Sequence, residues 1–152
     1  MTEVERIVDQ LHRGFFGDAW HGPSVLAALK DVSAGQANAR PIPGAHSVWE
    51  LVLHMTAWID IVEQGVHDRK PEVTDEIDWP TVSDTSDSAW SDALRQLQGS
   101  EERLESSAGK LDADRMDQIV TGSESSIYRL LHGVVQHNLY HAGQIILLRK
   151  ML

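Results

Sequence analysis

The chain of 152 residues contains no cysteine. Disulfides, thiolate metal ligands and a cysteine nucleophile are therefore excluded, and the composition fits a reducing cell interior. Long apolar runs are also missing, because no stretch reaches the roughly 18 residues that a membrane span needs. The N-terminal MTEVERIVDQLHRG lacks the continuous apolar region of a signal peptide. We therefore expect a soluble, cytoplasmic protein with no membrane partner.

Basic residues are scarce: 13 lysines and arginines stand against 23 acidic residues, for a formal net charge of −10. A phosphate backbone repels such a chain, so we expect no nucleic-acid partner. The hydrophobic fraction of 41% is ordinary for a folded protein. The length allows one hydrophobic core and is short for two. The sequence therefore predicts a single domain over residues 1–152.

Alternating strand patterns are absent too, whereas four long segments have apolar residues at helical spacing. These segments are residues 2–16, 47–67, 87–107 and 125–151. Thr2 with Glu5, and Ser47 with Glu50, form capping-box patterns at the start of the first two segments. Four such helices bury their apolar stripes most simply in an all-α fold, a four-helix bundle.

The connections between these segments are long. A short apolar run, PSVLAALKDV, extends or follows the first helix. Residues 33–47 are predicted to be a loop, because two prolines and two glycines interrupt any helix there. Residues 68–86 are polar, with Trp79 as an apolar anchor. Connections of this length leave the topology of the bundle open.

The last segment contains VVQHNLYHAGQ, which places His137 and His141 four residues apart. Side chains at this spacing differ by only about 40° in direction on an α-helix, so the two imidazoles can converge on one ion. Both are predicted on the core seam formed by Ile127, Leu130, Val134, His137, His141, Gln144 and Leu148. Imidazoles in a dry core are costly unless their ring nitrogens are satisfied. A divalent cation satisfies them.

His54, in ELVLHMTAW, is the best candidate for a third ligand because it borders the apolar stripe of another helix. Three histidines with an open coordination position describe a catalytic metal site, whereas a structural zinc site usually has four protein ligands. The sequence therefore predicts a divalent metal ion bound by His54, His137 and His141. The alternative is that these are hydrogen-bonded core histidines.

Residues beside the predicted ligands narrow the chemistry. Asn138 stands where a metalloprotease helix with this histidine spacing has its general-base glutamate, which disfavours that mechanism. Glu50 either caps its helix or serves the site as an acceptor or fourth ligand. Gln144 lies one turn beyond His141 and could orient it or a bound ligand. Tyr140 points about 100° away from the site, so we expect it to pack against neighbours.

The remaining histidines are predicted at helix ends, flanks and loops. His21 and His46 lie in loops beside helix starts, from which they could reach the rim of a pocket above the metal. We expect the others to lie outside the site.

HSVWELVLHMTAW at 46–58, LLHGVVQHNLYHAGQIILLRK at 130–150 and AWHGPSV near the start together resemble the DinB/YfiT-like family of metal-dependent bundle proteins. The family's three metal histidines correspond to His54, His137 and His141. The resemblance implies a four-helix bundle of up-down-down-up topology, a homodimer, and a divalent ion such as zinc or nickel.

The resemblance also implies a function, a thiol-dependent transferase that uses a low-molecular-weight thiol, such as bacillithiol, mycothiol or glutathione, on small electrophilic molecules. This fits a chain that has no sulfur nucleophile of its own. A metal-dependent hydrolase and a non-enzymatic, metal-binding or stress-associated bundle remain alternatives, and a bis-histidine haem site is a weaker one. No catalytic residue beyond the metal ligands is assigned.

Overall fold

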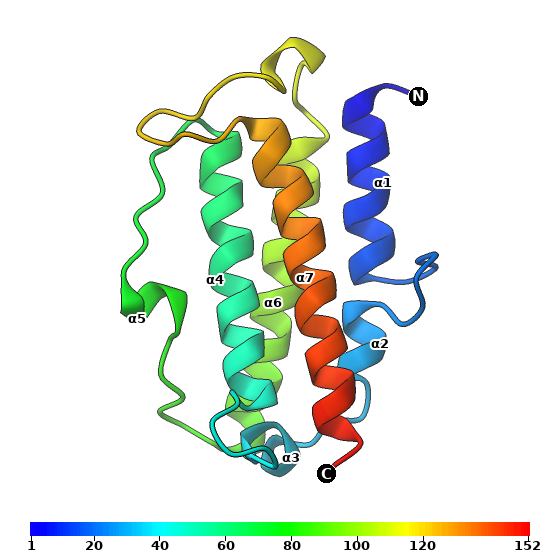
Figure 1. Cartoon of the computed structure of the whole chain (residues 1–152), viewed down its shortest axis with the longest axis vertical. Helices are drawn as coiled ribbons and strands as arrows, with labels where there is room; N and C mark the ends of the chain where they lie inside the picture. The colour runs from blue at the N-terminus through cyan, green and yellow to red at the C-terminus, as the bar shows by residue number, and fades with distance from the viewer.

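The computed structural model describes residues 1–152 and contains helices but no β-strand (Figure 1). Its four long helices are α1 (Glu3–Phe15), α4 (Val48–Val66), α6 (Asp87–Ala108) and α7 (Ile127–Arg149). Each lies within two residues of a segment expected from periodicity. The all-α four-helix bundle is therefore confirmed. None of the helices combines the length and apolar character needed to cross a bilayer.

The bundle has the up-down-down-up topology that the resemblance implies. In Figure 1, α1 and α7 run from the top of the view to the bottom, whereas α4 and α6 both run upward. Each long helix packs on two neighbours, α4 on α6 and α7, and α1 on α6 and α7. Because α4 and α6 are parallel, the chain must return between them. Residues 67–86, with the short α5 (Asp75–Asp78), make this return along one side of α4.

The helix starts are those that the capping patterns predict. Thr2 and Glu5 form a reciprocal capping box at the start of α1, as do Ser47 and Glu50 at the start of α4. Each pair satisfies two backbone N–H groups that have no partner within the helix. Glu50 also forms an ion pair with Arg40. The capping interpretation of Glu50 is therefore confirmed.

The prediction of a continuous loop over residues 33–47 is wrong. A one-turn helix, α3 (Ala34–Asn38), lies within it and begins with a capping box between Ser33 and Gln36. Both interrupting prolines come after this helix ends, so they do not oppose it. The run that follows α1 forms the short α2 (Val25–Leu29), capped by Ser24 and packed on α7. A 3-10 turn, η1 (Ala113–Arg115), precedes α7.

The predicted core seam of α7 is confirmed in part, since Ile127, Val134, His141 and Leu148 are buried. Leu130, His137 and Gln144 are only half-buried. The buried face of α7 also includes four residues outside the predicted seam, Leu131, Asn138, Ala142 and Ile145. Because this face includes a polar asparagine, the apolar pattern alone did not locate all of it. His137 consequently lies at the edge of the core rather than within it.

Candidate metal centre

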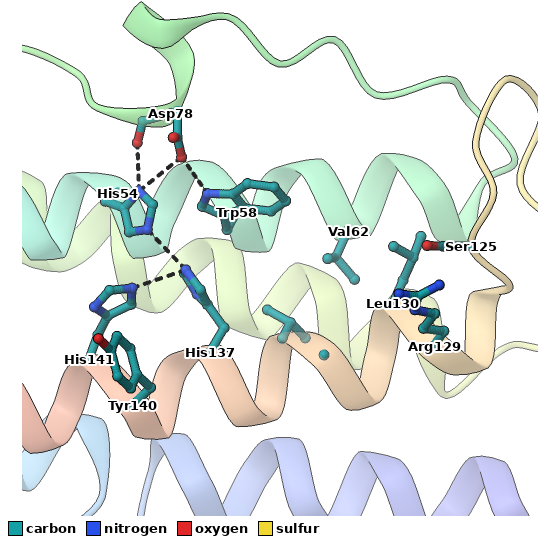
Figure 2. Close-up of a pocket in the computed structure, with 12 residues that line it drawn as sticks. His54, Trp58, Val62, Asp78, Ser125, Arg129, Leu130, His137, Tyr140 and His141 are labelled. Carbon is teal, nitrogen blue, oxygen red and sulfur yellow. Dashed lines mark hydrogen bonds and ion pairs between the residues drawn. The ribbon is translucent and has the colours of Figure 1, made fainter.

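Three histidines from two antiparallel helices meet at one point (Figure 2). Nε2 of His54 on α4 lies 3.0 Å from Nε2 of His137 on α7, and Nε2 of His141 lies 3.1 Å from the same atom. The candidate ligand atoms all lie within 4.8 Å of one another. Nitrogen ligands of one ion are about 3 to 3.5 Å apart when each bond to the metal is about 2.1 Å. The cluster is therefore compatible with a divalent metal site.

Hydrogen bonds on the far side of two rings decide where their protons are. Nδ1 of His54 lies 2.6 Å from the backbone oxygen of Asp78, and Nδ1 of His141 lies 2.6 Å from Oε1 of Gln144. Each oxygen can only accept, so each Nδ1 carries the hydrogen. The Nε2 atoms of His54 and His141 therefore both direct a lone pair at His137. The predicted orienting role of Gln144 is confirmed.

Burial keeps the rings of α7 neutral. It lowers the pKa of His137 to about 4, helped by the neighbouring His141 and His54, and it also lowers the pKa of His141. A neutral His137 offers at most one N–H from its Nε2 to the two lone pairs that face it. A cation at this point accepts lone pairs from all three rings at once. The donor set therefore fits a metal ion better than it fits a network of hydrogen bonds alone.

The segment after α4 supports His54 from outside the bundle. Oδ1 of Asp78, at the end of α5, accepts a hydrogen bond from Nε1 of Trp58 at 2.7 Å and lies 3.2 Å from Nδ1 of His54. Oxygen acceptors behind metal-binding histidines orient the ring and raise its basicity. Asp78 was not found from the sequence, because it lies in a polar connection 24 residues from His54 with no spacing signal.

The aromatic rings of His46, Trp79 and His54 form a stack beside the cluster. The ring of Trp79 is nearly parallel to that of His54, with centroids 3.9 Å apart, and to that of His46, with centroids 3.6 Å apart. Two imidazoles this close to one indole must lie on its opposite faces. His46 thus joins the surroundings of the site, as its loop position allowed. His21 does not, because it is exposed and its ring bonds to the carbonyl of Pro23.

The cluster opens onto a cavity of about 460 Å³ between α4 and α7. Trp58 and Tyr140 line it near the histidines, whereas Val62 of α4 and Leu130 of α7 line it farther from them (Figure 2). Tyr140 does not pack against neighbours as expected, because 66% of it is exposed. The orientation of α7 that leaves His137 half-buried also turns Tyr140 toward the opening of the cavity.

Asn138, which lies between His137 and His141 in the sequence, contacts α6. Asn138 is buried, and its Nδ2 lies 3.5 Å from Oε2 of Glu101 on α6. Glu101 itself has no exposed surface. Burial, followed by the charge of Glu105, raises the pKa of Glu101 to about 8. This pair is a polar contact inside the bundle and contributes no ligand to the cluster.

A family model described as the DinB superfamily matches residues 19–145, a range that includes all three histidines. No curated protein and no solved structure matches the sequence.

Proposed function

The chain belongs to the DinB superfamily, and from this premise we propose that it is a metal-dependent enzyme whose ion is held by His54, His137 and His141. The observation that supports this most directly is the convergence of three Nε2 atoms, two of which direct lone pairs inward. Imidazole nitrogens suit zinc, nickel and related divalent ions. We take zinc or nickel as the resident metal.

We propose that the reaction is the transfer of a low-molecular-weight thiol to a small electrophilic molecule. A divalent ion held by the three histidines would favour the thiolate form of a thiol bound beside it. The sulfur must come from a cosubstrate, because the chain has no cysteine. Asp78 and Gln144 hold two of the rings in place, and the cavity beside them has room for a small molecule.

The cavity wall weighs against a metal-dependent hydrolase. Such an enzyme needs a proton acceptor for the attacking water. Asp78 is the only carboxylate in the wall, and its Oδ1 already accepts a hydrogen bond from Trp58 and contacts His54. The open cavity also weighs against a purely structural ion, which is usually enclosed by four protein ligands. Three converging rings are one more than a bis-histidine haem uses.

Elemental analysis of protein purified without a histidine tag tests the site. We expect one divalent ion per chain in the wild type, and loss of that ion in His54→Ala and in His137→Ala. His21→Ala is the matched control, since it removes an exposed imidazole outside the site, and it should keep the ion. Turnover of electrophiles that requires an added thiol, and that is lost in His137→Ala, completes the test. An ion that survives both ligand substitutions would overturn the proposal.

We also propose that the chain forms a homodimer, as the resemblance implies. Large apolar side chains at the C-terminal end of α7 support this, since Leu147 is 61% exposed and Met151 58%. Light scattering of the purified protein measures the mass directly, and Leu147→Glu should shift it to that of a monomer. A monomeric wild-type protein would contradict the proposal.

A further inference from the structure

The cavity beside the histidines has a second polar end. It follows α7 from His141 back to the start of the helix, where it is lined by Arg129 of the first turn and by Ser125, which precedes the helix. Figure 2 shows these two residues grouped together at the end away from the three imidazoles. Val62 lies between the two ends in Figure 2, and Val134, which lies between Arg129 and His137 on α7, also lines the cavity. The cavity is therefore polar at both ends and apolar in the middle.

Arg129 differs from every other arginine of the chain. The guanidinium groups of the others form ion pairs or hydrogen bonds with acidic side chains or backbone carbonyls. The guanidinium of Arg129 forms no hydrogen bond or ion pair, and the backbone N–H of this residue is bonded to the hydroxyl of Ser126. The first turn of α7 contains no acidic residue. In a chain with a net charge of −10, this guanidinium has no internal counterion.

No carboxylate of the cavity wall neutralises this end. Asp78 is the only acidic residue in the wall, and it is held at the opposite end by Trp58 and His54. A guanidinium presents its donors in a planar fork that matches a carboxylate. The Ser125 hydroxyl is a further donor at the same end. The guanidinium of Arg129 and the hydroxyl of Ser125 therefore offer free hydrogen-bond donors to an anion.

We propose that Arg129, with Ser125, binds the carboxylate of an elongated small molecule whose other end reaches the three histidines. This inference rests on the proposed function, since it assumes an ion at the histidines. Eight residues of α-helix separate Arg129 from His137, which corresponds to about 12 Å along the axis. A ligand that spans this distance needs an extended apolar chain between its two ends. The ligand class is thus an apolar acid, and the carboxylate belongs either to the thiol or to the electrophile.

Calorimetric titration of the zinc-loaded protein tests the inference. The probes are mercaptooctanoate and mercaptooctanol, which share a thiol and a chain length and differ in the carboxylate. We expect the wild type to bind the acid about 10- to 100-fold more tightly than the alcohol, as a charge-assisted hydrogen bond predicts. Arg129→Gln should remove this preference and leave the affinity for the alcohol unchanged. Arg95→Gln, which removes an exposed arginine of α6 outside the cavity, is the matched control and should behave as the wild type.

A second arm identifies which substrate has the carboxylate. Octanoate, which has no thiol, is titrated with mercaptoethanol present in excess. If Arg129→Gln weakens the binding of octanoate but not that of mercaptooctanoate, the carboxylate belongs to the electrophile. If Arg129→Gln weakens the binding of mercaptooctanoate, the carboxylate belongs to the thiol. If neither probe loses affinity in Arg129→Gln, the inference is overturned. Because metal content is measured on the same samples, zinc-loaded protein with no Arg129 dependence refutes this inference alone, whereas protein that binds neither zinc nor nickel refutes the proposed function.

Discussion

Replacing Glu101 by glutamine is expected to stabilise the protein increasingly as the pH rises. The carboxyl group is fully buried in α6, its Oε1 has no hydrogen-bond partner, and its Oε2 has only a long contact of 3.5 Å to Nδ2 of Asn138. Burial and the nearby charge of Glu105 raise its pKa from 4.5 to about 8. The folded protein therefore holds a proton on this group that the unfolded chain releases at much lower pH.

The sign of the effect follows from proton linkage. Below pH 4.5 both states hold the proton, so Glu101 contributes no pH dependence to the free energy of unfolding. Between 4.5 and about 8 the folded state binds more protons than the unfolded state, so stability falls as the pH rises. Each pH unit in this window costs up to about 1.4 kcal/mol, which gives an upper limit of about 5 kcal/mol.

Urea unfolding of the wild type and of Glu101→Gln at pH 5, 7 and 9, with chelator present throughout, measures this directly. The difference in free energy of unfolding should be small at pH 5 and should approach the limit of about 5 kcal/mol in favour of the variant at pH 9. Glu102→Gln changes an exposed neighbour on the same helix and should stay within about 0.5 kcal/mol of the wild type at every pH. A difference for Glu101→Gln that does not change with pH would refute the reasoning.

Three further predictions concern the site and the helix starts. Asp78→Ala removes the acceptor of Trp58 and the carboxylate that lies 3.2 Å from Nδ1 of His54, but it keeps the backbone oxygen that accepts from this nitrogen. Zinc affinity measured by chelator competition should therefore fall about 10- to 100-fold; an unchanged affinity would show that the backbone oxygen alone orients the ring. Zinc at about 100 times its dissociation constant should raise the free energy of unfolding of the wild type by about 2.7 kcal/mol. Thermal scans with and without zinc measure this gain, which should be absent in His137→Ala. Ser47→Ala removes the cap of α4 and should cost about 1 kcal/mol; equal urea midpoints for variant and wild type would contradict the capping argument.

The parts of this protein that were predictable from its sequence depend on neighbours along the chain. Ser47 and Glu50 are three residues apart, and a capping box needs nothing more distant than that. His137 and His141 share a direction because of the helical repeat, whatever α7 packs against. The four long helices could be predicted for the same reason, since each repeats an apolar pattern over at least 13 residues. α3 has only five residues, too few to show a period, and it was missed.

Other features depend on how the helices pack, which no local pattern contains. The contact of Asp78 with His54 exists because the return from α4 to α6 passes along α4. The orientation of α7 in the bundle places Asn138 against Glu101, and it directs His137 and Tyr140 toward a cavity instead of the core. Arg129 faces that cavity for the same reason. The sequence alone thus determined which residues could share a helix face, because helix geometry is the same everywhere. The tertiary structure decided what each face meets, because that depends on contacts between segments far apart in the chain.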